Sequence, residues 1–224
     1  MKNKGLLLCA IIVSILLVDQ CIKFYIKTHF RLGEEILPLG VSWCRLHFVE
    51  NEGMAFGWSL GGEWGKVILS LFRLVAVVFL GLYMRSLLRQ NVNFGFLCCL
   101  ALVWAGAFGN IIDSIFYGLL FSSSEGTTLP ALLLPQGGGY AGLLHGRVVD
   151  MFYFPLWSGL LPNWLPVWGG QYSEFFRPVF NFADASISVG VFFIVLLQTR
   201  FFPDSSKQTP EPTMTETPEL PEMN

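Results

Sequence analysis

Two aspartates are the residues of this chain whose type and setting point most directly to chemistry. Asp150 follows two valines and precedes Met151 and Phe152, and Asp184 closes the sequence FNFAD. Both lie beside stretches apolar enough to enter a lipid bilayer, where a carboxylate at the centre of a helix costs at least ~2.5–3.5 kcal/mol. Two carboxylates that share one proton are suited to hydrolysis, because one acts as a base while the other stays protonated. We therefore take these residues as the candidate catalytic pair.

The composition indicates a membrane protein. Hydrophobic residues make up 53% of the 224 residues and charged residues only 13%, and the mean hydropathy is +0.56. The apolar residues come in long blocks and not in alternating faces, which excludes an ordinary soluble domain. The five cysteines and three histidines lack the spacing of a metal site, and the proposed hydrolysis requires neither a metal nor an organic cofactor.

Four apolar blocks approach the ~20 residues that a spanning helix requires. They cover residues 5–26, 67–83, 94–120 and 179–202. If each block crosses once, the basic residues at positions 2, 4, 85, 89, 200 and 207 fall on one side, which the positive-inside rule assigns to the cytoplasm. We expect one membrane-embedded domain over residues 1–202 with both termini cytoplasmic. The polar composition of residues 203–224 predicts a disordered tail.

The unusual polar residues of the spans gather at the outer leaflet in this topology. They are Asp19 and Lys23 near the outer end of the first span, Asn110 and Asp113 near that of the third, and the candidate catalytic pair. Asp19 and Lys23 share one helix face, and both a structural ion pair and a role in shaping the site are open to them. Structural hydrogen bonding is an alternative for Asn110 and is favoured for Asp113.

A further motif lies between the first two spans. Alternating apolar residues over positions 46–49 predict a short strand, and Asn51 and Gly53 after it favour a turn or bulge. One interpretation is an ordinary hairpin at the membrane surface. The other is a sheet edge on which an extended peptide docks through backbone hydrogen bonds.

At these residues the chain resembles bacterial lipoprotein signal peptidase, also called signal peptidase II, a family of membrane aspartyl proteases. The resemblance extends to about residue 199 and rests on five motifs in the family's order. They are D-Q-x-x-K at 19–23, V-x-N-x-G-x-A-F-G at 49–57, G-N-x-x-D at 109–113, V-V-D at 148–150 and F-N-x-A-D at 180–184. The set is specific because the motifs occur in the family's order and lie at the ends of the predicted spans.

The resemblance implies a mainly α membrane protein, with four transmembrane helices, a small extracytoplasmic β-cradle and an interfacial half-helix. It implies that Asp150 and Asp184 are catalytic. The residues that it assigns to shaping or lining the site are Asp19, Lys23, Asn51, Gly53, Asn110, Asp113, Asn181 and Ala183.

The implied activity is that of an aspartic endopeptidase which removes the signal peptide from diacylglyceryl-modified prolipoproteins and cuts before the lipidated cysteine. The implied location is the outer leaflet of the bacterial cytoplasmic (inner) membrane. The implied partners are these prolipoproteins, membrane lipid and cyclic peptide inhibitors of the globomycin type. We expect a monomer and no nucleic acid.

One departure from the family's pattern concerns an arginine. Ser114 stands where an Arg usually follows the Asp of the third-helix motif. The contact that such an Arg makes is therefore lost or supplied from elsewhere, and Arg147 and Arg177 are the candidates.

The second departure is the length of segment 121–178, which carries Trp157, Trp164 and Trp168 besides the Asp150 motif. Tryptophan favours the headgroup region of a bilayer, so we interpret this segment as an interfacial flap. Two roles are open to it: a lid that admits the substrate, or a longer loop without a part in catalysis.

The leading alternative function is a proton-coupled transporter or channel, since intramembrane carboxylates also serve proton relays. A transporter would spread acidic groups across the membrane thickness or carry an inverted repeat. Here the acidic groups cluster at one level, and the sequence shows no repeat. A structural scaffold, a third alternative, would not need two intramembrane carboxylates.

Overall fold

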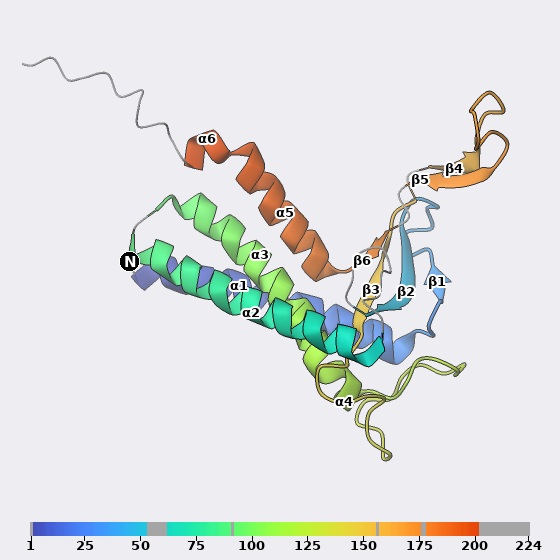
Figure 1. Ribbon diagram of the computed structural model, residues 1–224, viewed down its shortest axis with the longest axis horizontal. Coiled ribbons are helices and arrows are strands. Elements are labelled where there is room, and N and C mark those ends of the chain that lie inside the picture. The colour runs from blue at the N-terminus through green and yellow to red at the C-terminus, as the bar shows by residue number, and fades with distance from the viewer. Residues whose placement is uncertain (1, 53–61, 91, 156, 176–177, 202–224) are drawn as a thin grey trace, which may run out of the picture.

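The fold of the chain is a group of helices that carries a small sheet at one end (Figure 1). The computed structural model describes residues 2–52, 62–90, 92–155, 157–175 and 178–201. Helices α1 (Lys2–His29), α2 (Gly62–Arg89), α3 (Phe94–Ile112) and α5 (Phe182–Leu196) form the group, and α3 packs against the other three. The short α6 (Gln198–Phe201) follows α5 and lies at the same end of the group as the start of α1.

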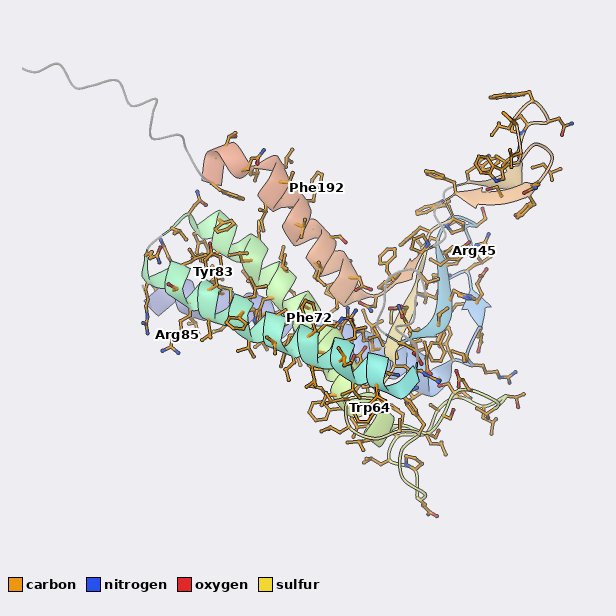
Figure 2. All side chains as sticks on the ribbon, viewed as in Figure 1. Arg45, Trp64, Phe72, Tyr83, Arg85 and Phe192 are labelled. Atoms are coloured by element: carbon orange, nitrogen blue, oxygen red, sulfur yellow. The ribbon has the colours of Figure 1, made fainter. Side chains whose placement is uncertain are left out.

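Within the described residues, three helical stretches are long and apolar enough to cross a membrane: Asn3–His29, Trp64–Arg89 and Phe94–Leu120. The expectation of a mainly helical chain with membrane-length apolar helices and a small sheet is thereby confirmed. The first two helices extend several residues beyond the predicted blocks at both ends. Apolar side chains such as Phe72, Tyr83 and Phe192 lie exposed on the outside of the helices (Figure 2), as expected for surfaces that face lipid.

Glycines allow α3 and α5 to approach closely. A Cβ atom on Gly106 would collide with the backbone carbonyl of Ala183, and one on Gly190 would lie 2.7 Å from that of Cys99. Small residues at helix crossings are the usual means of close packing in membranes, because helices in lipid have no hydrophobic driving force for association. The crossing brings the start of α5 next to the polar end of α3.

The polar end of α3 widens into a π-helix, η2 (Asp113–Tyr117), before a last turn, α4 (Gly118–Leu120). Asp113, Ser114 and Tyr117 are buried within it. The Ser114 hydroxyl donates to the carbonyl of Asn110 at 3.1 Å, one turn back. Such π-turns inside α-helices are frequent at functional sites.

An antiparallel sheet covers this end of the helices, in the order β1 (Glu35–Ile36), β2 (Arg45–Asn51), β3 (Val148–Tyr153) and β6 (Val179–Phe180). The predicted strand before Asn51 is therefore present, and it is longer than expected. A register shift in β2 between Leu46 and Val49 leaves Val49 opposite Asp150. A hydrophobic cluster joins the sheet to the helices, and it includes Ile26, Phe48, Tyr117, Phe121, Val149 and Met151.

The described residues of segment 121–178 form loops and strands and no helix. Strands β4 (Trp157–Leu160) and β5 (Tyr172–Phe175) pair as a separate hairpin, which projects from the sheet away from the helices (Figure 1). The expected half-helix is thus not found within this segment. Any such element over 53–61 lies outside the described residues.

Candidate active site

Asp150 lies at the middle of β3, where its strand neighbours are almost fully buried. Only 3% of its surface is exposed. The Asn181 amide Nδ2 donates to Asp150 Oδ1 at 2.7 Å, and that of Asn51, at the end of β2, donates to Oδ2 at 3.3 Å. By the alternation of a strand, this carboxyl lies on the opposite face from Val149 and Met151, which pack in the hydrophobic cluster with Ile26 and Tyr117.

Asp184 lies in the first turn of α5 and is fixed there by a capping box. The Asn181 side chain accepts from the Asp184 backbone N–H at 2.9 Å, and Asp184 Oδ2 accepts from the Asn181 backbone N–H at 3.3 Å. This reciprocal pair satisfies two of the free N–H groups at a helix start. Asp184 Oδ1 then accepts from the Asn110 amide at 2.7 Å.

Asn181 joins the two aspartates. Its Nδ2 donates to Asp150 and also to Asn110 Oδ1 at 3.1 Å, while its backbone and Oδ1 hold Asp184. The asparagine itself is completely buried. Both carboxyls are therefore attached to one small set of amides, although 33 residues lie between them in the sequence.

A buried charged layer lies directly behind the amides. Lys23 Nζ contacts Asp19 Oδ2 at 2.9 Å and Asp113 Oδ2 at 2.8 Å, and it donates to Asn110 Oδ1 at 2.8 Å. These contacts use all three donors of the ammonium group. Since Lys23 binds the oxygen of Asn110, the nitrogen of this amide is turned toward Asp184.

The two acids of this layer also hold the backbone beside Asp150 and Asp184. Asp19 Oδ1 accepts from the backbone N–H of Ala183 at 2.9 Å, next to Asp184. Asp113 Oδ2 accepts from that of Val149 at 3.3 Å, next to Asp150. The ion pair between Asp19 and Lys23 is thus structural, and through Ala183 it contacts the segment that carries Asp184.

Gln20 is a site residue that the sequence reasoning did not select, although it stands inside the D-Q-x-x-K motif. Its Nε2 donates to Asp113 at 2.9 Å and to Asp19 at 3.1 Å, and its Oε1 accepts from the Tyr117 hydroxyl at 3.1 Å. A polar residue between two charged ones within an apolar span was the available signal.

The pKa of Asp150 is raised by its surroundings. Burial, followed by the nearby charge of Asp184, raises it from 3.8 to about 7. The negative charge of Asp184 makes the ionisation of Asp150 harder. Near neutral pH the pair can therefore hold one proton.

A cavity of about 240 Å³ borders the site between α2, α3 and α5. Asp184 and Asn110 line it together with apolar side chains and Arg73 of α2. Sequence reasoning missed Arg73 as well. The sequence feature that could have indicated it is that Arg73 is the single charged residue within the apolar block 67–83.

Among the described residues, Arg147 forms no ion pair with Asp150 or Asp184. Arg147 forms ion pairs with Glu125 at 2.7 Å and Glu50 at 3.5 Å, and its guanidinium lies over the Tyr140 ring. These contacts hold Arg147 to Glu125, Glu50 and Tyr140 and not to the two aspartates. Gly53 and Arg177 lie outside the described residues.

The structure thus combines helices of membrane length with two carboxyls that are joined through one amide. Comparison with known proteins gives the family. The family model described as "Signal peptidase (SPase) II" matches residues 11–200. The chain belongs to the signal peptidase II family and is an aspartyl peptidase.

Relatives from two bacteria agree with this family. The lipoprotein signal peptidase of Porphyromonas gingivalis is 49% identical over 214 residues, which cover 94% of this chain and 92% of the relative. That of Amoebophilus asiaticus is 35% identical over 198 residues, covering 87% and 76%.

Solved structures agree with the fold. Two bacterial membrane enzymes superpose with TM-scores of 0.52 and 0.55 at 22% and 19% identity. The alignments cover 91% and 87% of this chain and 93% and 94% of the other two. At this level of identity the likeness concerns the fold alone.

Proposed function

We propose that Asp150 and Asp184 are the catalytic pair with which this enzyme removes signal peptides from prolipoproteins. The family carries out this reaction, and the membership of the chain does not favour the transporter alternative. We infer further that the bond cut precedes a cysteine that carries a diacylglyceryl group. The observation that carries the proposal is the attachment of both carboxyls to Asn181.

The reaction follows from a pair that holds one proton. The ionised carboxylate takes a proton from a water molecule, whose oxygen attacks the scissile carbonyl carbon. The protonated carboxyl donates a hydrogen bond to the carbonyl oxygen and polarises it. The C–N bond of the tetrahedral intermediate then breaks, and the amine leaves with a proton from the pair. The raised pKa of Asp150 supports this residue as the one that holds the shared proton.

The location of the site supports a substrate that arrives within the membrane. The pair lies where the sheet meets the helices, at the opposite end from α6 and the start of α1 (Figure 1). Residues 182–201, with α5 and α6, are 20 residues long, and at ~1.5 Å per residue they would reach about 30 Å. We infer that they form a fourth span, that both termini are cytoplasmic and that the pair faces the outer leaflet.

The test is cleavage of a lipidated prolipoprotein by the purified full chain. We expect Asp150→Asn and Asp184→Asn each to abolish cleavage while the far-ultraviolet circular dichroism stays unchanged, because Asn keeps shape and polarity but cannot act as an acid–base pair. A prolipoprotein whose cysteine is replaced by serine, and so is not lipidated, should not be cut. Full activity in either Asn variant would overturn the assignment of the pair.

A further inference from the structure

Arg73 is an arginine within a membrane-length helix. It is residue 12 of the 28 in α2, and it is partly buried. Within the described part of the chain, no residue forms an ion pair or hydrogen bond with it. An intramembrane cation costs at least ~2.5 kcal/mol and usually has a functional partner. Figure 2 labels its neighbour Phe72 near the middle of α2 and Arg85 toward the far end.

The cavity that Arg73 lines has two chemically different parts. Its polar lining consists of Arg73, Asn110 and Asp184, and its apolar lining includes Val77, Leu80 and Ile187. An acyl chain suits the apolar part. The guanidinium offers five N–H donors and no acceptor, so its natural ligand is an oxygen atom.

The charges near Arg73 indicate which kind of oxygen atom it can bind. The charge of Asp184 and, to a smaller extent, that of Asp150 act on Arg73. Neither carboxylate lies within 4.0 Å of the guanidinium as an ion-pair partner. A phosphate or carboxylate ligand would be repelled by Asp184 in the same cavity. A neutral carbonyl oxygen accepts hydrogen bonds from a guanidinium without this repulsion.

We propose that Arg73 is a substrate-positioning residue that donates hydrogen bonds to a carbonyl oxygen of the lipidated substrate, while an acyl chain occupies the apolar part of the cavity. This inference rests on the proposed function and adds a residue to it. The carbonyl belongs either to an acyl ester of the lipid or to the peptide backbone. Both share the same acceptor chemistry, and the two sources can be separated by experiment.

The first experiment measures kcat and KM of the purified full chain on a synthetic peptide with a diacylglyceryl cysteine. Loss of a charge-assisted hydrogen bond in Arg73→Gln should raise KM about tenfold to a hundredfold and leave kcat within about twofold. Arg73→Lys, which keeps the charge, should fall between the wild type and Arg73→Gln. Arg85→Gln, a matched loss of charge on the same helix, should behave as the wild type.

Two results would overturn the proposal. An unchanged KM in Arg73→Gln would mean that the side chain merely extends to the membrane surface. A fall in kcat at constant KM, with a displaced pH profile, would mean that the guanidinium acts on the aspartates and not on the substrate.

The second experiment identifies the carbonyl with a substrate whose acyl esters are replaced by ethers. If an ester carbonyl is bound, the wild type should bind this analogue as weakly as Arg73→Gln binds the ester, and the effect of the variant should vanish. If a backbone carbonyl is bound, the full effect of the variant should remain.

The third experiment separates this inference from the proposed function. Binding of the lipopeptide is compared between Asp150→Asn and the double variant Asp150→Asn with Arg73→Gln. Weaker binding by the double variant supports the role of Arg73, and equal binding contradicts it. Cleavage by the single variant would instead contradict the assignment of the catalytic pair.

Discussion

Asn181 is the residue that connects the two aspartates of the candidate site. It caps α5, holds Asp184 through both backbone and side chain, and donates to Asp150 and Asn110. A single side chain thus sets the distance between the strand that carries one carboxyl and the helix that carries the other. Its effect on catalysis and its effect on stability should therefore appear together.

We expect Asn181→Ala to lower kcat by about a hundredfold, since a misplacement of the pair by about 1 Å has an effect of this size. Loss of the cap and of buried hydrogen bonds should also lower the free energy of unfolding by about 1–3 kcal/mol. Ser186→Ala is the matched control on the same helix, because the Ser186 hydroxyl bonds only the carbonyl of Phe182 among the described residues. Normal kcat in Asn181→Ala would refute the role of this residue.

The raised pKa of Asp150 predicts how stability depends on pH. In the unfolded chain this carboxyl ionises near ~3.9, whereas in the folded protein it stays protonated up to about 7. Its contribution to stability is therefore fully present below the unfolded value and is lost as the pH rises through the folded value. The melting temperature of the wild type should fall relative to Asp150→Asn between about pH 4 and 7, and the difference should be constant above. A constant difference across the whole range would contradict the shift.

The catalytic rate should depend on the same ionisation of Asp150. Above about pH 7 the pair loses its shared proton, so kcat should fall as the pH rises. The measurement is the alkaline limb of kcat on the lipopeptide. An activity that keeps rising up to pH 9 would show that a protonated carboxyl is not required.

At the scale of elements, a second buried ion pair joins α1, the sheet and the loop before β3. Lys27 pairs with Glu50 and donates to the Ser124 hydroxyl at 3.1 Å, and Ser124 donates to Glu50 at 2.9 Å. The side chains of Lys27 and Glu50 are 0% and 3% exposed. Because Glu50 precedes Asn51, this network also fixes the end of β2 that holds Asp150.

We expect Lys27→Met to destabilise the protein by about 3–5 kcal/mol, because Glu50 would remain buried without its main counterion. Adding Glu50→Gln should restore much of that loss. The control is Arg45→Met, which breaks the more exposed pair with Glu35 and should cost less than about 1 kcal/mol. Thermal unfolding in detergent measures all of these, and additive effects of the two buried changes would contradict the coupling.

The sequence predicted the elements better than the contacts between them. The apolar blocks and the alternation before Asn51 are local patterns, so the helices and β2 could be inferred. The register that places Val49 opposite Asp150, and the pairing of Lys27 with Glu50, depend on segments far apart in the chain. No local pattern encodes such contacts, and for this reason Arg147 was considered for the site while Arg73 was not.

At the scale of the whole molecule, the hairpin of β4 and β5 is the part farthest from the helices in Figure 1. Trp157, Trp164 and Trp168 are 46%, 79% and 58% exposed on it. Aromatic side chains that extend from the sheet in this way suit the headgroup region. We therefore expect the hairpin to contact the membrane surface and not Asp150 or Asp184.

Replacing the three tryptophans by alanine should raise KM more than it lowers kcat for a substrate embedded in vesicles, because the hairpin would no longer hold the enzyme at the substrate's depth. Phenylalanine at the same positions is the matched control and should retain most of the affinity. Unchanged kinetics of the alanine variant would leave the hairpin without a part in catalysis.

The spacing of Asp19 and Lys23 also bears on how the protein is made. Ribosomal synthesis delivers α1 to the membrane long before Asp113 of α3 exists, so an isolated charge in α1 would have to enter the bilayer alone. The two residues are one helical turn apart and contact each other at 2.9 Å, so the newly inserted helix carries its own counterion. When α3 arrives, Asp113 and Asn110 join a lysine that is already neutralised. The order of insertion and the assembly of the polar centre are in this way compatible.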